Sequence, residues 1–326
     1  MRILIPNYCS ADSFVDNVTE TLRMMGHEVV NMGIISNSLY TSPFYRLWKQ
    51  TSQKLLNTWS EQEKWMVKTS QHFKPDLLLS LTQSLSEEPL HLIRKNGVKT
   101  ISWWGDPAAN MIGKGLCHAE WDLIFIKDQY AAFKLTSLNL PAFQLYEAMN
   151  PLWHKPIAHQ QNDKVLLAGT FYDYRHYLTL QLIKRGIDVS LYGGRLPRWA
   201  SPELRKRHTG KYVVREEKSR VFGEALAVLN CTAMREFDSV NCRAFEIAGC
   251  GGLQIMEYRA SIEECFEPGK EILVYRTLDE LDDLIEHALK FPKEMEVIRS
   301  KAALRSHQQH TYRHRLDVIL NKFNEL

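Results

Sequence analysis

The sequence predicts an α/β protein of two doubly wound domains, each built around a parallel sheet. Short buried-strand patterns alternate with helical patterns over the first 152 residues, and the same alternation begins again near residue 160. Between them lies 148–163, a polar stretch with two prolines and no periodicity. We therefore predict domains at 1–152 and 160–300, and a C-terminal helix, 301–326, that packs toward the first domain.

The chain opens with a βαβ pattern. RILIP at 2–6 reads as a buried strand, and the helix that follows carries its apolar residues at helical spacing, namely Phe14, Val15, Val18, Leu22 and Met25. Gly26 ends this helix, and HEVVNMG resumes a strand. Such an opening predicts the start of a parallel sheet.

The rest of the first domain continues the alternation. Residues 38–73 are helical in pattern and rich in Trp and Tyr, and three buried strands are expected at 75–81, 99–104 and 121–127. The aromatic and basic stretch 40–59 fits a pair of core-packing helices, which we favour, or a segment resting on a bilayer surface.

The second domain repeats the pattern. Strands are expected at 164–170, 187–194, 224–231 and 253–256, with a helix at 174–186 and another opening near 241. Two Rossmann-like domains of this kind would face one another across a cleft, and ligands of such sheets bind outside the carboxyl ends of the strands. The end of the chain is helical, with one apolar stripe made by Tyr312, Leu316, Ile319, Leu320 and Phe323.

Composition narrows the class of protein. Of the 326 residues, 44% are hydrophobic and 24% charged, which is ordinary for a globular protein, and the net charge of +3 is too small to indicate nucleic-acid binding. The basic stretch 198–215 suits a phosphorylated ligand or an anionic membrane surface, although a solvated surface is the simpler interpretation. No window approaches ~18 consecutive apolar residues, so no spanning helix is expected. Six scattered cysteines indicate neither a zinc site nor a disulfide framework and fit a reducing cytoplasm.

Two loops of the second domain carry the densest polar chemistry. In GTFYDYR, Gly169 allows a ligand close to the backbone, and Arg175 opens a helix where guanidinium and amide donors both favour a diphosphate. The alternative is an ordinary surface ion pair for Arg175. In TAMREFDSVNCRAFE, Asn241 or Ser239 can cap the next helix, which leaves its first amides ready for a phosphate.

Glu246 lies about one turn inside that second helix. A carboxylate there can accept hydrogen bonds from the vicinal hydroxyls of a ribose, whereas the alternative is an exposed helix glutamate. The helix then stops at Gly249, Gly251 and Gly252, which allow a tight turn into LQIM.

The second domain resembles the donor-binding segment of GT-B glycosyltransferases, specifically the CgeB spore-maturation-type family. That family has an N-x-R-x-F-E run, an E-x-x-F-x-P-G-K-E segment followed by a short strand and a D-E-L helix, and a terminal H-T-Y-x-x-R. The chain matches these with Asn241, Arg243, Phe245 and Glu246, with Phe266, Pro268, Gly269, Lys270 and Glu271, and with His310, Thr311, Tyr312 and Arg315. GTFYDYR is similar to the family's early glycine loop.

The resemblance implies a GT-B fold and a nucleotide-sugar donor held by the second domain, with Glu246 on the ribose and Arg175 near the diphosphate. The retaining GT-B enzymes share an E-x7-E pattern, and here Asp238 stands eight residues before Glu246. The donor-binding residues expected on this basis are Gly169, Thr170, Tyr172, Arg175, Asp238, Asn241, Arg243 and Glu246.

Asp106 is the expected catalytic residue of the first domain. It follows directly on a strand in TISWWGDPAAN, and Trp103 and Trp104 before it would offer flat faces to a sugar or nucleobase. The alternative is a routine Asp-Pro turn beside core tryptophans. In an inverting enzyme Asp106 would be the general base, whereas in a retaining enzyme the departing phosphate would take the proton and Asp106 would position the acceptor.

The expected function is transfer of a sugar from a nucleotide-sugar donor to a hydroxyl of a glycan, lipid-linked or protein acceptor, in glycan or cell-surface polysaccharide biosynthesis. No D-x-D pair occurs, so we expect no metal and no other cofactor. A nucleotide-sugar epimerase or hydrolase, or a non-catalytic nucleotide-sugar-binding protein, is the alternative. We expect a cytoplasmic protein, with peripheral contact to the inner membrane face as a further possibility.

Overall fold

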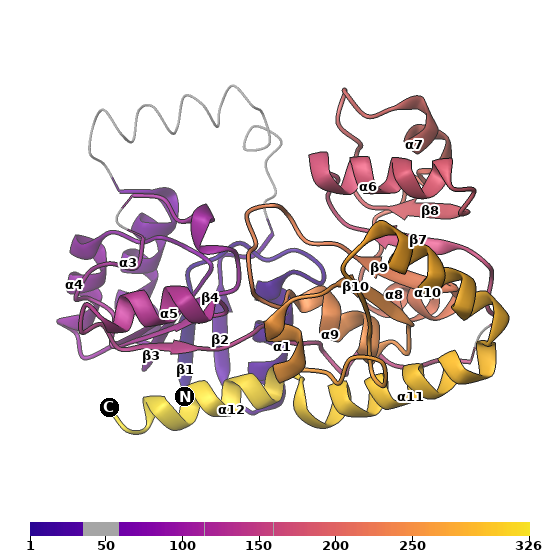
Figure 1. Ribbon diagram of the computed structural model, residues 1–326. Helices are drawn as coiled ribbons and strands as arrows, with labels where there is room; N and C mark the ends of the chain where they lie inside the picture. The colour runs from indigo at the N-terminus through magenta and orange to yellow at the C-terminus, as the bar shows by residue number, and fades with distance from the viewer. Residues whose placement is uncertain (35–58, 114, 159) are drawn as a thin grey trace. The chain divides into compact units, whose positions relative to one another are not determined.

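The computed structural model describes residues 1–34, 59–113, 115–158 and 160–326. By its internal contacts the chain divides into two compact units, the first comprising Met1–Tyr146 and Arg315–Leu326 and the second Glu147–His314. Each unit contains one parallel sheet with its helices (Figure 1). The boundaries between the two units fall at 146/147 and 314/315. The sequence predicts domain boundaries at 152/160 and 300/301.

The sheet of the first unit has the strand order β2-β1-β3-β4-β5-β6 among the described residues, with every neighbouring pair parallel. Its strands are β1 (Arg2–Ile5), β2 (Glu28–Asn31), β3 (Leu77–Leu81), β4 (Lys99–Trp104), β5 (Leu123–Ile126) and β6 (Ala142–Gln144). The five strands expected here are confirmed. The three-residue β6 was not predicted, because so short a strand leaves no readable pattern.

The helices of the first unit are α1 (Phe14–Met24), α3 (Glu61–Phe73), α4 (Glu87–Arg94), the 3₁₀ turn η2 (Ala108–Asn110) and α5 (Gln129–Thr136). Three of them, α1, α3 and α5, start at side-chain caps. Ser13 caps α1, and Ser60 with Glu63 forms a capping box on α3. Residues 40–58 of the aromatic and basic stretch lie outside the described residues.

The sheet of the second unit has the order β11-β10-β9-β7-β8, again with parallel neighbours. Its strands are β7 (Val165–Ala168), β8 (Val189–Tyr192), β9 (Ala227–Asn230), β10 (Gln254–Glu257) and β11 (Leu273–Tyr275). The chain winds first one way to β8 and then the other way from β9, so the order reverses between β7 and β9. Open α/β sheets bind ligands at such a switch point, beyond the carboxyl ends of the strands.

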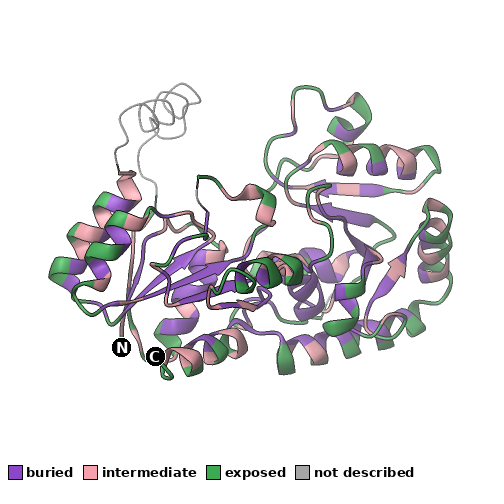
Figure 2. Cartoon of the chain, turned by 60° about the vertical axis from the view of Figure 1, so that its left-hand side comes forward, coloured by how far each residue is buried: buried purple, intermediate pink, exposed green. Residues whose placement is uncertain are grey.

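Helices cover both faces of this second sheet. They are α6 (Asp173–Lys184), α7 (Pro202–Arg207), α8 (Glu216–Glu224), α9 (Cys242–Gly249), η3 (Ala260–Glu264), α10 (Leu278–Lys290) and α11 (Pro292–Gln309). Alternate residues of β7 enter two separate cores: Val165 and Leu167 pack with α6, α10 and α11, whereas Leu166 and Ala168 pack with α8 and α9. The strands are therefore buried on both faces (Figure 2), as a doubly wound sheet requires.

The chain ends in α12 (Tyr312–Phe323), as the apolar stripe predicted. Tyr312, Leu316 and Ile319 of that stripe are buried, and the Lys322 ammonium lies 4.3 Å from the centre of the Phe143 ring. Among the described residues, no helix combines the length and apolarity needed to cross a bilayer.

The predicted linker needs a correction in its first half. Ala148, Met149 and Trp153 are buried in the second unit, and the backbone of Met149 pairs with that of Thr311. Asn150 and His154 are polar but buried, and the Asn150 amide donates to His154 Nδ1 at 3.1 Å. The polar composition of 148–154 therefore belongs to a packed turn and not to a solvated connection.

Candidate functional site

Two glycines bring the backbone of neighbouring turns into contact at the carboxyl edge of the second sheet. Gly169 follows β7 with φ +123°, and Gly193 follows β8 with φ +150°. A Cβ at Gly193 would stand 2.2 Å from the Gly169 carbonyl oxygen, so no side chain fits there. Glycine at both positions leaves main chain, not side chains, lining the edge beside the switch point.

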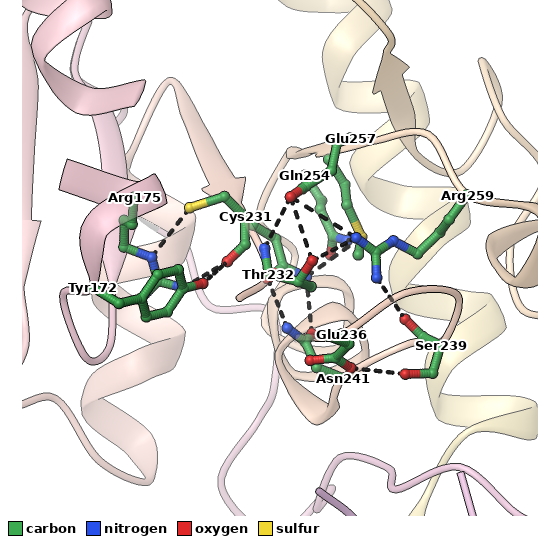
Figure 3. A network of polar contacts seen from close by, with 12 residues as sticks. Tyr172, Arg175, Cys231, Thr232, Glu236, Ser239, Asn241, Gln254, Glu257 and Arg259 are labelled. Atoms are coloured by element: carbon green, nitrogen blue, oxygen red, sulfur yellow. Dashed lines mark hydrogen bonds and ion pairs between the residues drawn. The ribbon is translucent and has the colours of Figure 1, made fainter. Parts of the chain in front are cut away.

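Arg175 joins the two strands that flank the switch point. From the first turn of α6 its guanidinium donates to the Thr170 carbonyl at 2.7 Å. It also donates to the Cys231 carbonyl at 2.6 Å, and its Nε lies 3.1 Å from Cys231 Sγ (Figure 3). The side chain is buried. These contacts fasten the loop after β7 to the end of β9, so Arg175 acts as a brace, and its contact with a diphosphate stays a prediction.

Tyr172 closes the same corner. Its hydroxyl donates to the Cys231 carbonyl at 2.8 Å, next to the guanidinium of Arg175 (Figure 3). Burial raises the pKa of the Tyr172 hydroxyl and of the Cys231 thiol, so both are neutral near pH 7. Neither side chain is therefore a nucleophile near neutral pH. Thr170 of the same loop is exposed.

The amino end of α9 is capped as the sequence allowed, and Asn241 is the cap. Its side-chain oxygen accepts from the Ala244 amide at 3.2 Å. The carboxamides of Asn230 and Asn241 also bond to each other in both directions, at 3.0 and 3.2 Å, which ties the end of β9 to the helix start. Ser239, the other candidate, donates to Glu236 instead.

The loop between β9 and α9 is tethered to the next strand. Arg259 donates to the Ser239 carbonyl at 3.0 Å and to the Thr232 hydroxyl, and the Thr232 amide donates to Glu257 Oε1 at 3.0 Å (Figure 3). Burial raises the pKa of Glu257, and the neighbouring Arg259 offsets this only in part. The pair of Glu257 and Arg259 was not predicted from the sequence.

Asp238 belongs to the same tether. It is exposed and accepts from the Ser261 amide at 3.0 Å. Asp238 therefore holds the loop, and its role as a donor-binding residue stays a prediction.

Arg243 and Glu246 form a charged cluster with a third residue. Glu246 is buried, with Oε1 2.8 Å from Lys218 Nζ and Oε2 3.1 Å from Arg243 Nη1. A Cβ at Gly169 would lie 3.9 Å from Arg243 Nη2. This guanidinium therefore also reaches the sheet edge formed by Gly169 and Gly193, which we call the glycine edge. The fold thus connects Gly169, Arg175, Arg243 and Glu246.

Lys218 was not predicted as a site residue. It lies on α8, three and four residues before the buried Val221 and Phe222, so it shares their helix face. A lysine at an apolar position of an amphipathic helix is the sequence signal that could have indicated a buried anionic partner.

A pocket of about 470 Å³ adjoins the glycine edge at the carboxyl end of β8. Its lining includes Gly193, Gly194, Arg195, Arg205, His208 and Tyr212. Arg205 directs its guanidinium to three carbonyls of the 197–200 turn, whereas Arg195 is exposed and makes no ion pair with any residue that the structure describes. This volume lies within the range of small-molecule sites.

A second pocket, of about 300 Å³, has the opposite charge. It is lined by Glu263, Glu267 and Glu271 with Arg305 of α11. Three carboxylates would repel a diphosphate, so charge favours the pocket at β8 over this one as part of a nucleotide site.

Asp106 lies in the first unit, at the carboxyl end of β4. It is exposed, and its carboxylate accepts from Asn110 Nδ2 at 3.2 Å. Its catalytic role stays a prediction. The expectation for the adjacent tryptophans is wrong, because Trp103 and Trp104 are buried, with Trp103 edge-on to Phe14, and so present no face to a ligand.

Comparisons with known proteins bear on this arrangement. Residues 175–321 match the family model described as Glycosyl transferase-like, which spans most of the second unit. No curated protein sequence matches the chain.

Solved structures match over the whole length. HepE of Anabaena, crystallised with UDP-glucose, is 11% identical, with 100% of both chains covered and a TM-score of 0.65. Sucrose-phosphate synthase from Thermosynechococcus elongatus is 12% identical, with 99% of this chain and 98% of that chain covered and a TM-score of 0.66. AviGT4, a glycosyltransferase involved in avilamycin A biosynthesis, is 12% identical, with 100% and 97% covered and a TM-score of 0.63.

At these identities the likeness establishes the architecture, and the predicted GT-B fold is confirmed. The family match and the fold together support an enzyme of glycosyl transfer. The chain is therefore a GT-B protein with a glycosyl transferase-like segment at residues 175–321.

Proposed function

We propose that the chain is a glycosyltransferase that binds a nucleoside diphosphate sugar at the carboxyl edge of its second sheet and transfers the sugar to a hydroxyl acceptor. The observation that carries this proposal is the contact of Gly169 with Gly193 beside the switch point, near Arg243 and the capped start of α9. Main chain, a guanidinium and a helix N-terminus then meet at one place, and all three favour a diphosphate.

The nucleobase would occupy the pocket at the end of β8, beside the glycine edge. Its volume of about 470 Å³ accommodates a base, and Tyr212 and the glycine backbone supply a flat face and amide groups. Arg195, which has no anionic partner in the described part of the chain, would add charge on the pocket side. Glu246 would accept from a ribose hydroxyl.

Uridine is the nucleoside that we propose to test first. HepE was crystallised with UDP-glucose, with UDP and glucose, and with UDP, and it shares the fold over the whole chain. A hexose is the corresponding choice of sugar, and membership in the CgeB-type branch is the finer proposal for the family.

The chemistry would proceed without a metal ion. As the bond from the sugar C1 to the phosphate oxygen breaks, negative charge builds on the diphosphate, where Arg243 and the α9 amides would stabilise it. Asp106 would take the acceptor proton in an inverting reaction. Removal of divalent cations with EDTA should therefore change the turnover number by less than about twofold relative to the untreated enzyme.

The experiment has two stages. First, thermal stabilisation by UDP-, GDP-, dTDP- and CMP-sugars identifies the donor, since a ligand at ~100 times its Kd adds ~2.7 kcal/mol of stability. Second, the labelled donor is incubated with a glycan, lipid-linked or protein hydroxyl acceptor. Label in the acceptor supports transfer, release only to water indicates a hydrolase, and an altered donor sugar indicates an epimerase.

A lack of stabilisation by every nucleotide sugar would contradict the proposal. Stabilisation without turnover across the acceptors would favour a binding protein. Cytoplasmic location, with peripheral contact to an anionic membrane through the basic stretch 198–215, is proposed with the function and is tested by fractionation of cells that produce the protein.

A further inference from the structure

The two cations that hold Glu246 differ in their freedom to leave it. The Lys218 ammonium lies 2.8 Å from Oε1, and both side chains are only 4% exposed. The Arg243 guanidinium lies 3.1 Å from Oε2, and its side chain is 22% exposed. One partner is enclosed with the carboxylate, and the other reaches the edge of the site.

Lys218 is enclosed because α8 packs on α9 through the same face. Val221 and Phe222 of α8 share a core with Ile247 of α9, one residue after Glu246. An ammonium taken out of water in this way is stable only with a charged partner, and Glu246 supplies it. The pair cannot separate without opening the contact of the two helices.

Arg243 can move. It belongs to the first turn of α9, its guanidinium carbon lies 5.5 Å from the centre of the Phe222 ring, and Nη2 approaches Gly169. An anion bound at the glycine edge would compete with Glu246 for this guanidinium. Planar bidentate donors bind a phosphate as well as they bind a carboxylate.

We propose that Lys218 is a positioning residue that keeps Glu246 charged and oriented while Arg243 turns from Glu246 to the diphosphate of the donor. The exchange would take Arg243 away from Oε2 of Glu246, to which a ribose hydroxyl would then donate, so phosphate and ribose recognition become coupled. This inference rests on the proposed function. Without Lys218, the departure of Arg243 would leave a buried carboxylate with neither of these two cations, and the exchange would be opposed.

The test compares UDP with uridine, because uridine offers the ribose but no diphosphate to attract Arg243. In wild-type protein UDP should bind much more tightly than uridine. We expect Lys218→Met to lower the ratio of the two affinities about tenfold and to raise KM for the donor more than it lowers kcat, whereas Lys218→Arg should restore the ratio to within threefold. Arg220→Met, which removes an exposed cation of α8 that pairs with Glu224, is the matched control and should leave the ratio unchanged.

A double-mutant cycle keeps the inference testable if Lys218→Met alone does not fold. Glu246→Gln removes the charge that Lys218 neutralises, so Lys218→Met in that background should fold and change the affinity ratio less than twofold. An unchanged ratio in Lys218→Met, or an equal loss in Lys218→Arg, would overturn the inference. If wild-type protein prefers another base in the donor screen, that nucleoside and its diphosphate replace uridine and UDP. If wild-type protein binds no nucleoside diphosphate, the proposed function and this inference fail together. If wild-type protein binds it normally and Lys218→Met does not change the affinity ratio, the inference alone fails.

Discussion

Two buried arginines hold opposite ends of strand β9, and they do so in different surroundings. At the carboxyl end Arg175 donates to the carbonyls of Thr170 and Cys231 beside the glycine edge. At the amino end Arg299 of α11 donates to the carbonyls of Ala225 at 2.8 Å and Leu226 at 2.7 Å. Both guanidiniums thus replace ladder hydrogen bonds that the sheet cannot supply at its ends.

The difference lies in what surrounds each arginine. Arg299 also lies within reach of two further carbonyls, those of Gly223 and Gly251, and burial lowers its pKa to about 10. Burial acts on Arg175 in the same direction, but the Cys231 thiol and Tyr172 hydroxyl beside it raise its pKa overall. The amino end is thus closed by main chain, whereas the carboxyl end has polar groups, a second guanidinium and a pocket. Changes at the first end should affect folding alone, and changes at the second should affect ligand binding.

The largest effect on stability is expected from Arg299→Met. The substitution leaves several buried carbonyls without a donor, each at a cost of roughly 1–3 kcal/mol, so we expect the free energy of unfolding to fall by about 3 kcal/mol. Urea denaturation measures this loss. The UDP affinity of the folded fraction should stay within twofold of wild type, and a tenfold loss of affinity would contradict the division between the two ends.

Gly193→Ala should lower both stability and binding. The new Cβ would meet the Gly169 carbonyl oxygen at 2.2 Å, which forces the two turns apart. Overpacking of this kind costs roughly 1–3 kcal/mol, and we expect a loss of about 2 kcal/mol with at least a ~tenfold weaker Kd for UDP.

Gly194→Ala is the matched control for that substitution, because a Cβ there meets nothing within 4 Å. It should change stability by less than ~0.5 kcal/mol. Equal losses in both variants would mean that the pocket lining, and not the contact of the two turns, determines the result.

Asn241→Ala is expected to have a smaller effect. Loss of the cap on α9 should lower the free energy of unfolding by about 1 kcal/mol and weaken UDP binding a few-fold. Asn241→Asp keeps an oxygen acceptor for the Ala244 amide but brings a negative charge to the proposed phosphate site. Thermal melts and calorimetric titration with UDP should then show weaker binding, with a loss of stability no larger than in Asn241→Ala, because aspartate keeps the cap but cannot donate to Asn230 Oδ1. Normal binding in Asn241→Asp would place the diphosphate elsewhere.

The fold was predictable because it depends on patterns that are local in the sequence. Strands such as β7 and β9 are short apolar runs between polar turns, and their alternation with helices leaves few topologies. The three-residue β6 was not predictable in this way. The linker was misjudged at Asn150 and His154, because two polar residues that bond to each other inside a turn have the same composition as a solvated segment.

The site was only partly predictable, because side-chain partners come from distant parts of the chain. The spacing of Asn241, Arg243 and Glu246 on one helix was visible, but Lys218 lies 28 positions before Glu246 and meets it through the packing of α8 on α9. Arg175 was located correctly at a helix start, yet no local pattern indicates that Cys231 and Thr170 occupy its guanidinium. Trp103 and Trp104 looked accessible because a strand end does not reveal which ring faces the core.

The smallest effect should come from Glu257→Gln at the carboxyl end, and it depends on pH. Burial raises the pKa of Glu257 in the folded protein above its ordinary value of 4.5. The folded state therefore binds this proton more tightly than the unfolded state, and the carboxyl contributes a loss of stability as the pH rises through the interval between the two pKa values.

The amide side chain introduced by Glu257→Gln would keep an oxygen for the Thr232 amide without the charge. We expect the variant to be more stable than wild type at pH 8 and the difference to shrink as the pH falls toward 4.5, as measured by urea denaturation at several pH values. A difference that grew on acidification would reverse the sign and show that the folded protein stabilises the ionised carboxylate. A difference that shrinks on acidification, as predicted, would instead show that ionised Glu257 lowers the stability of the folded protein. Glu257 would then be a group kept at the carboxyl end of the sheet despite its cost to folding. The carbonyls around Arg299, by contrast, are expected to serve folding alone.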